Sequence, residues 1–119
     1  MPKFGIDISS FNGDINFSII KEQIDFVMIR CGYGSDTVSQ DDSKYERNVR
    51  ECEALGIPYG IYFYSYALNL EDVNSEIQHC LRQVKKAKPS YGVWLDMEDG
   101  DGYKTNHGFP SKEMLVTIC

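Results

Sequence analysis

Three acidic side chains, Asp96, Glu98 and Asp99, follow an apolar run at residues 93–95. Side chains alternate along a strand, so Asp96 and Glu98 are expected on one face and Asp99 on the other. Two carboxylates that share a concave site raise the pKa of at least one of them. One protonated acid beside one carboxylate is the pair that glycoside cleavage uses, because the acid protonates the leaving oxygen while the anion stabilises the developing positive charge. The alternative is that the three acids only begin a solvated loop.

Further polar and aromatic side chains stand where the other apolar runs end. They are Asp7, Tyr33 and the alternating series Tyr62, Tyr64 and Tyr66. The carboxyl ends of parallel strands form the reactive face of a sheet, so these side chains are expected near the acids. The three alternating tyrosines are expected on one face, where their rings and hydroxyls can contact sugars. The alternative is that they belong to the core, as aromatic stripes in strands often do.

Two other aromatic residues are expected to pack rather than to bind. Phe63 lies between the alternating tyrosines and therefore points to the opposite face of the strand. The single tryptophan, Trp94, lies inside the last apolar run. We therefore interpret Trp94 as a packing residue and not as a platform for a sugar ring.

The elements that must position these side chains are strands alternating with helices. Apolar runs rich in β-branched and aromatic residues, bounded by turn residues, predict strands at 4–8, 26–31, 57–67 and 93–97. Helical spacing of apolar residues predicts helices at 16–23, between the N-cap candidates at 41–43 and Gly56, and between Asn69 and Pro89. Another helical pattern opens at Pro110 and continues to Ile118.

This alternation, with near-continuous apolar strands, indicates an α/β fold in which helices cover a parallel sheet. Two architectures fit: a doubly wound sheet, and a barrel of βα units. Four βα units make about half of an irregular (β/α)8 barrel and leave two parallel edges open. We therefore expect residues 1–119 to form a single truncated domain. Its open edges are expected to pair with a second copy in a homodimer, or to exchange elements with it.

The overall charge narrows the choice of partners. The 119 residues carry a formal net charge of −6, which leaves no basic surface for nucleic acid or for anionic lipid. No apolar run approaches the ~18 residues of a membrane helix, and the first residues lack the apolar core of a signal peptide. We therefore expect a protein that is made in the cytoplasm and is soluble.

The sequence predicts no metal and no cofactor. Neither His79 nor His107 has a second ligand at zinc spacing, and the acids after residue 95 do not match a calcium loop. Gly32 and Gly34 lack the third glycine of a dinucleotide site. The four cysteines, at positions 31, 52, 80 and 119, form no CxxC pair and are expected to be reduced packing residues.

Four segments together resemble the glycoside hydrolase family 25 lysozymes, the N-acetylmuramidases of Chalaropsis type. They are GIDISSFNGDINF, IDFVMIRCGYG, GIPYGIYFYSYA and VWLDMED, and they occur in the order and at the spacing of the family. The resemblance implies an irregular β/α barrel that cleaves the β-1,4 bond between N-acetylmuramic acid and N-acetylglucosamine in peptidoglycan glycan strands. It further implies that Glu98 is the general acid, Asp96 its charged partner and Asp7 another active-site acid, with Tyr62 and Tyr64 close to the cleaved sugar. Such an enzyme acts on the cell wall after release.

The resemblance leaves three hypotheses open. The first is a muramidase, or a fragment of one, in which either the Asp96 carboxylate or the acetamido group of the substrate assists bond cleavage. The second is a non-catalytic remnant that binds the cell wall, because family domains are longer and their later strands supply a W-Q-Y segment and another aspartate. The third is an unrelated doubly wound domain in which the acids are loop residues.

Overall fold

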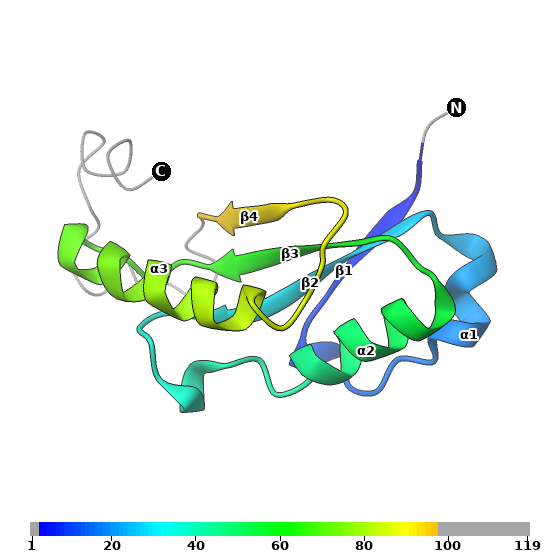
Figure 1. Ribbon diagram of the computed structural model, residues 1–119, viewed down its shortest axis with the longest axis horizontal. Coiled ribbons are helices and arrows are strands. Elements are labelled where there is room, and N and C mark those ends of the chain that lie inside the picture. Colours follow the sequence, from blue (N-terminus) through cyan, green and yellow to red (C-terminus); the bar gives the residue numbers. More distant parts are fainter. Residues whose placement is uncertain (1–2, 98–119) are drawn as a thin grey trace.

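The computed structural model of the chain describes residues 3–97, which form a four-stranded parallel sheet (Figure 1). The strands are β1 (Gly5–Ile8), β2 (Phe26–Tyr33), β3 (Tyr59–Tyr64) and β4 (Val93–Asp96). All four predicted strands are therefore confirmed, although β2 runs further than predicted and β3 ends earlier. The predicted β3 continued to Ala67. It stops at Tyr64 because the buried Glu76 carboxylate binds Ser65 Oγ and the backbone N–H of Tyr66, both at 2.7 Å, and turns the chain.

Three α-helices connect the strands. They are α1 (Phe17–Ile20), which continues into the 3-10 helix η2 (Lys21–Gln23), α2 (Tyr45–Leu55) and α3 (Leu70–Val84). Two further 3-10 turns, η1 (Ser10–Asn12) and η3 (Val38–Gln40), lie after β1 and β2. None of these helices, all within residues 3–97, is long and apolar enough to span a membrane.

The ends of α2 and α3 mostly follow the expected signals. Asn69 caps α3 by accepting the backbone N–H of Asp72 at 2.9 Å, and Gly56 ends α2 at a positive φ of 68°. The N-cap predicted for α2 among residues 41–43 is wrong. Lys44 stands at that position, and the Asp42 carboxylate accepts the backbone N–H of Lys44 at 2.9 Å and the guanidinium Nε of Arg30 at 2.8 Å.

The strand order decides between the two predicted architectures. The order is β1-β2-β3-β4, every neighbouring pair is parallel, and α2 and α3 contact the same strand, β2. A doubly wound sheet requires the strand order to reverse near the first strand. Consecutive order is instead what βα units of a barrel produce. The prediction of a barrel segment is confirmed, and the doubly wound alternative is wrong.

The hydrophobic core lies between the sheet and the helices. It is built from alternate strand residues, of which Val27, Ile29 and Ile61 are fully buried, together with Val49 and Cys52 of α2. Burying each such side chain stabilises the fold by about 1.5–3 kcal/mol. The opposite face of the sheet carries the intervening residues, so alternation along the strands separates the core from a polar face.

Candidate active site

The face of the sheet turned away from the core carries a cleft of ≈ 590 Å³. Asp7, Arg30, Tyr62, Tyr64, Trp94 and Asp96 line it, and they come from all four strands. The strand register explains their proximity: β3 places Tyr62 beside Trp94 of β4 and Tyr64 beside Asp96. Two acids that are far apart in the sequence therefore reach one concave surface, as predicted for Asp7 and Asp96.

Tyr62 lines the cleft and is the register partner of Arg30 in the neighbouring strand. Its hydroxyl donates to the backbone carbonyl of Ile8 at 3.4 Å. Burial first, and then the negative charge of Asp7, raise the pKa of Tyr62 to about 12. The phenol therefore stays protonated at neutral pH, so it can donate a hydrogen bond in the cleft without adding a charge.

Arg30 brings a positive charge to the cleft, and no sequence motif pointed to it as a site residue. Its side chain is 9% exposed, and its Nε donates to Asp42 Oδ2 at 2.8 Å. The guanidinium also donates to Ser10 Oγ at 3.2 Å, and it lies 5.1 Å from the ring of Phe11 and 5.3 Å from that of Tyr33. A charged residue at an alternate position of an otherwise apolar strand was the available signal, because such a side chain points away from the core.

Two adjacent aspartates hold the segment between β2 and α2 in place. Asp42 binds residues around the cleft, and Asp41 binds α3. Asp42 Oδ2 also accepts the backbone N–H of Ser10 at 2.9 Å, which joins the segment to the residues after β1. Asp41 accepts two N–H groups of Arg82, at 2.7 and 2.8 Å, and lies 2.7 Å from His79 Nε2. The hydrogen bonds from Arg82 hold the pKa of Asp41 below its usual value. Adjacent aspartates thus connect the cleft to α3.

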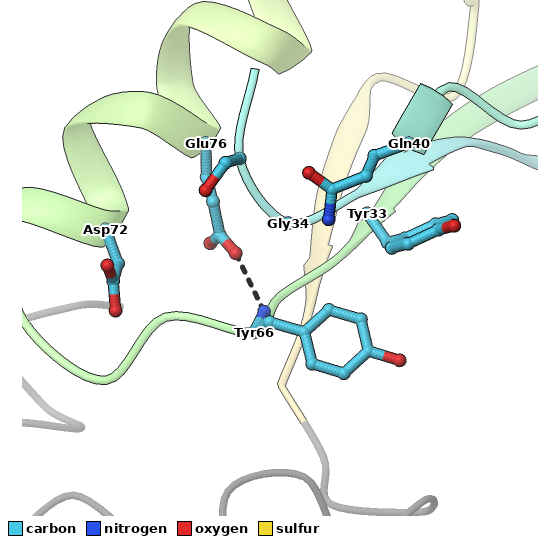
Figure 2. Close-up of a pocket in the computed structure, with 7 residues that line it drawn as sticks. Tyr33, Gly34, Gln40, Tyr66, Asp72 and Glu76 are labelled. Atoms are coloured by element: carbon cyan, nitrogen blue, oxygen red, sulfur yellow. Dashed lines mark hydrogen bonds between the residues drawn. The ribbon is translucent and has the colours of Figure 1, made fainter. Parts of the chain in front are cut away.

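Tyr33 lies beside the cleft rather than inside it. It lines a neighbouring hollow of ≈ 530 Å³ that shares Arg30 and Tyr64 with the cleft. A third hollow of ≈ 280 Å³ is lined by Tyr33, Tyr66, Gln40 and Glu76, whose carboxylate accepts the backbone N–H of Tyr66 (Figure 2). The rings of Tyr33 and Tyr66 meet edge to face, with centroids 5.8 Å apart. The third hollow shares Tyr33 and Tyr66 with the second.

Two aromatic predictions had opposite outcomes. Phe63 is buried, as predicted, with its ring 5.1 Å from that of His79. The prediction that Trp94 is a packing residue is wrong, because Trp94 is 61% exposed and lines the cleft. The reason is position: within residues 3–97, β4 is an edge strand, and no strand covers its outer side.

The predicted general acid, Glu98, lies outside the described residues, as do Asp99, His107 and the helix predicted from Pro110. Among residues 3–97, no cluster of three His, Cys, Asp or Glu side chains is arranged to hold a metal ion. His79 is fully buried, with Nδ1 3.1 Å from the carbonyl oxygen of Gly34, so its ring serves the packing of α3. The described part of the site therefore consists of two carboxylates, one arginine and a set of aromatic rings.

The chain is similar to glycosyl hydrolases in both sequence and structure. The profile of "Glycosyl hydrolases family 25" matches residues 6–115. No curated protein sequence matches the chain significantly. Among solved structures, the modular autolysin LytC from Streptococcus pneumoniae, in complex with a synthetic peptidoglycan ligand, is 34% identical with a TM-score of 0.72. The alignment covers 82% of this chain and 23% of that one.

Two more distant structures share the fold. The spore cortex lytic enzyme SleM of Clostridium perfringens is 19% identical with a TM-score of 0.73, over 98% of this chain and 37% of that one. A family 25 glycosyl hydrolase from Bacillus anthracis is 19% identical with a TM-score of 0.67, over 96% of this chain and 52% of that one. The chain thus spans between about a quarter and about half of the length of these three solved chains.

Proposed function

The chain belongs to glycosyl hydrolase family 25, and we propose that it forms the amino-terminal part of a muramidase active site. The reaction is hydrolysis of the β-1,4 bond between N-acetylmuramic acid and N-acetylglucosamine in peptidoglycan. The observation that carries the proposal is the convergence of Asp7 and Asp96, from the first and last described strands, on one cleft with Tyr62 and Arg30. The likeness to an autolysin solved with a peptidoglycan ligand supports this substrate class.

Each side chain then has a role that suits its chemistry. Glu98, two positions beyond Asp96 in the sequence, is the proton donor to the leaving oxygen. Asp96 stabilises the positive charge that develops on the sugar, either directly or by orienting its acetamido group. Asp7 adds a second negative charge to the cleft. Tyr62 and Tyr64 contact the sugar rings with their faces and hydroxyls. Tyr33 contacts a neighbouring part of the substrate from the adjacent hollow.

Digestion of purified peptidoglycan tests this proposal. Wild type, Glu98→Gln, Asp96→Asn and Asp7→Asn are compared with Glu46→Gln, a control whose charge lies on the exposed surface of α2. We expect new reducing ends on N-acetylmuramic acid from wild type and control, and a loss of at least about a hundredfold in the Glu98 variant. Wild type that releases no more reducing sugar than Glu98→Gln would show that this chain is not a catalyst.

A second candidate function is binding to the cell wall without cleavage. The exposed Trp94 favours it, because an aromatic face beside two carboxylates can hold a sugar whether or not the reaction follows. Sedimentation with insoluble peptidoglycan distinguishes the two functions. Binding that Trp94→Ala abolishes, together with no new reducing ends, supports the binding role. A protein that remains in the supernatant excludes it.

We further propose that a second copy of the chain covers the open edges of the sheet. Within residues 3–97, no strand pairs with the outer edge of β1 or β4, and Val93 and Leu95 are each almost half exposed. Parallel edges that bear apolar side chains tend to pair with another strand. Light scattering on the 119-residue chain is expected to give the mass of a dimer. A monomeric mass with a cooperative melt would contradict this arrangement.

We also propose that the protein acts on the cell wall after its release from the cytoplasm. Immunoblots of cells and medium, before and after lysis, test the location. We expect the protein inside intact cells and in the medium only after lysis.

A further inference from the structure

Two cysteine side chains meet where α3 packs on β2. Cys31 is fully buried at the point where the β2 register shifts, and Cys80 lies partly buried on α3. Helix residues on both sides of Cys80 contact the strand directly. Gln83 Nε2 donates to the carbonyl oxygen of Cys31 at 2.9 Å, and His79 Nδ1 lies 3.1 Å from that of Gly34. Cys80 is therefore held opposite the strand segment that contains Cys31.

The two thiols influence each other's ionisation, and their environments differ. The neighbouring Cys31 thiol lowers the pKa of Cys80, whereas the Cys80 thiol and burial raise the pKa of Cys31. Cys80 also lines an apolar hollow of ≈ 250 Å³ beside Val93 and Leu95, where a reagent can reach it. Cys80 is thus the more accessible thiol and the one expected to react first, while Cys31 is fully buried.

Cys52 offers an internal comparison. It is fully buried on α2, and burial raises its pKa to about 12. No other thiol contributes to the shift of Cys52, whereas Cys31 and Cys80 each shift the pKa of the other. Cys52 therefore represents a packing thiol of the same protein, with neither an accessible partner nor a lowered pKa.

We propose that Cys31 and Cys80 form an intramolecular disulfide when the folded protein meets a small-molecule disulfide such as oxidised glutathione. The Cys80 thiolate attacks one sulfur of the reagent, whose S–S bond breaks and releases one thiolate. The Cys31 thiol then gives up its proton and attacks the Cys80 sulfur, which expels the second half of the reagent as a thiolate. Two protein thiols are oxidised by two electrons, and the reagent is reduced to two thiols.

The bond fastens the part of α3 that supports the candidate site. Arg82 and His79, near Cys80 on the same helix, hold Asp41. The neighbouring Asp42 holds Arg30 at the cleft. A disulfide persists in oxidising surroundings and is rare in the reducing cytoplasm. Oxidation therefore gives this protein a more rigid form outside the cell, independently of whether the cleft is catalytic.

Intact-mass analysis of the full chain tests the proposal. The fourth thiol is removed by Cys119→Ser, and the protein is incubated under native conditions with oxidised glutathione. We expect the loss of two hydrogen atoms per molecule and a peptide map in which Cys31 is joined to Cys80. Cys52→Ser is the matched control and should lose the same two hydrogens. Oxidation is expected to raise Tm by at least about 5 °C, because closing a long loop restricts the unfolded chain.

Replacing each of the two cysteines in turn separates the two steps of the thiol–disulfide exchange. Cys31→Ala should retain one glutathione on Cys80, because no second thiol displaces it. Cys80→Ala, which changes a partly exposed residue, should keep its mass, because the buried Cys31 is neither ionised nor reachable. Three results would overturn the proposal: a stable glutathione adduct on the protein with both cysteines, a cross-link that includes Cys52, or unchanged thiols after prolonged incubation.

Discussion

Replacing Asp42 with asparagine should destabilise the protein strongly, because Asp42 neutralises a buried arginine. Its carboxylate is 0% exposed and accepts three N–H groups: Arg30 Nε at 2.8 Å and the backbone amides of Ser10 and Lys44, each at 2.9 Å. Asparagine presents an N–H₂ group to one of these donors and leaves the guanidinium without its counterion. Breaking a buried ion pair from one side costs about 3–5 kcal/mol.

The expected loss is large compared with the stability of an ordinary domain, which is about 5–15 kcal/mol. With a urea m value of about 2 kcal/mol/M, it corresponds to a fall of about 2 M in the midpoint of urea unfolding, followed by circular dichroism. Asp14→Asn is the matched control. Asp14 pairs with Lys44 at 2.6 Å but is 65% exposed, so its midpoint should not change measurably.

A double-mutant cycle identifies the cause of the loss. Arg30→Met removes the charge that Asp42 neutralises, so the double variant should be destabilised less than the sum of the single variants, by at least about 2 kcal/mol. The reasoning is refuted if Asp42→Asn loses less than about 1 kcal/mol, or if the two substitutions are additive. Either result would mean that solvent, rather than Asp42, satisfies Arg30.

Three other predictions concern the cleft and its supports. Trp94, the single tryptophan, should change its fluorescence when soluble peptidoglycan fragments bind, and a spectrum unaffected at saturation would place binding elsewhere. The pKa values of Tyr59 and Tyr62, raised by burial to about 12 from 10.0, predict stability that is full below pH 10 and lost as pH rises toward 12. Unfolding at a series of pH values, with Tyr62→Phe as the less sensitive variant, measures this loss. Because Arg82 lowers the pKa of Asp41 from 3.8, the stability advantage of wild type over Asp41→Asn should be full above that pH and shrink below it; a difference independent of pH would contradict this.

Local patterns in the sequence predicted the strands and helices of the fold. Alternation and β-branched residues identified the four strands, and helical spacing identified α2 and α3. Asp7 and Asp96 were found because a polar residue at the end of an apolar strand must lie at the carboxyl edge of a parallel sheet. Each of these inferences depends on neighbours within a few residues, so the chain could supply them without its tertiary structure.

Pairings between distant segments could not be predicted in this way. Arg30 and Asp42 pair because the segment after β2 folds back toward that strand, as the bridge between Gly32 and Asp41 shows. Trp94 is exposed because of where β4 lies in the strand order, a property that no local pattern contains. The placement of Cys80 opposite Cys31 likewise depends on how α3 packs on β2.

The amino-acid sequence was therefore enough to predict the alternation of strands and helices, the resemblance to a hydrolase family, and the polar residues at the strand ends. Which charge neutralises which, and which aromatic ring faces solvent, followed only from the packing of the folded chain. The physical reason is that periodicity fixes the direction of a side chain relative to its own strand or helix. What that side chain meets depends on the packing of elements that are distant in the chain.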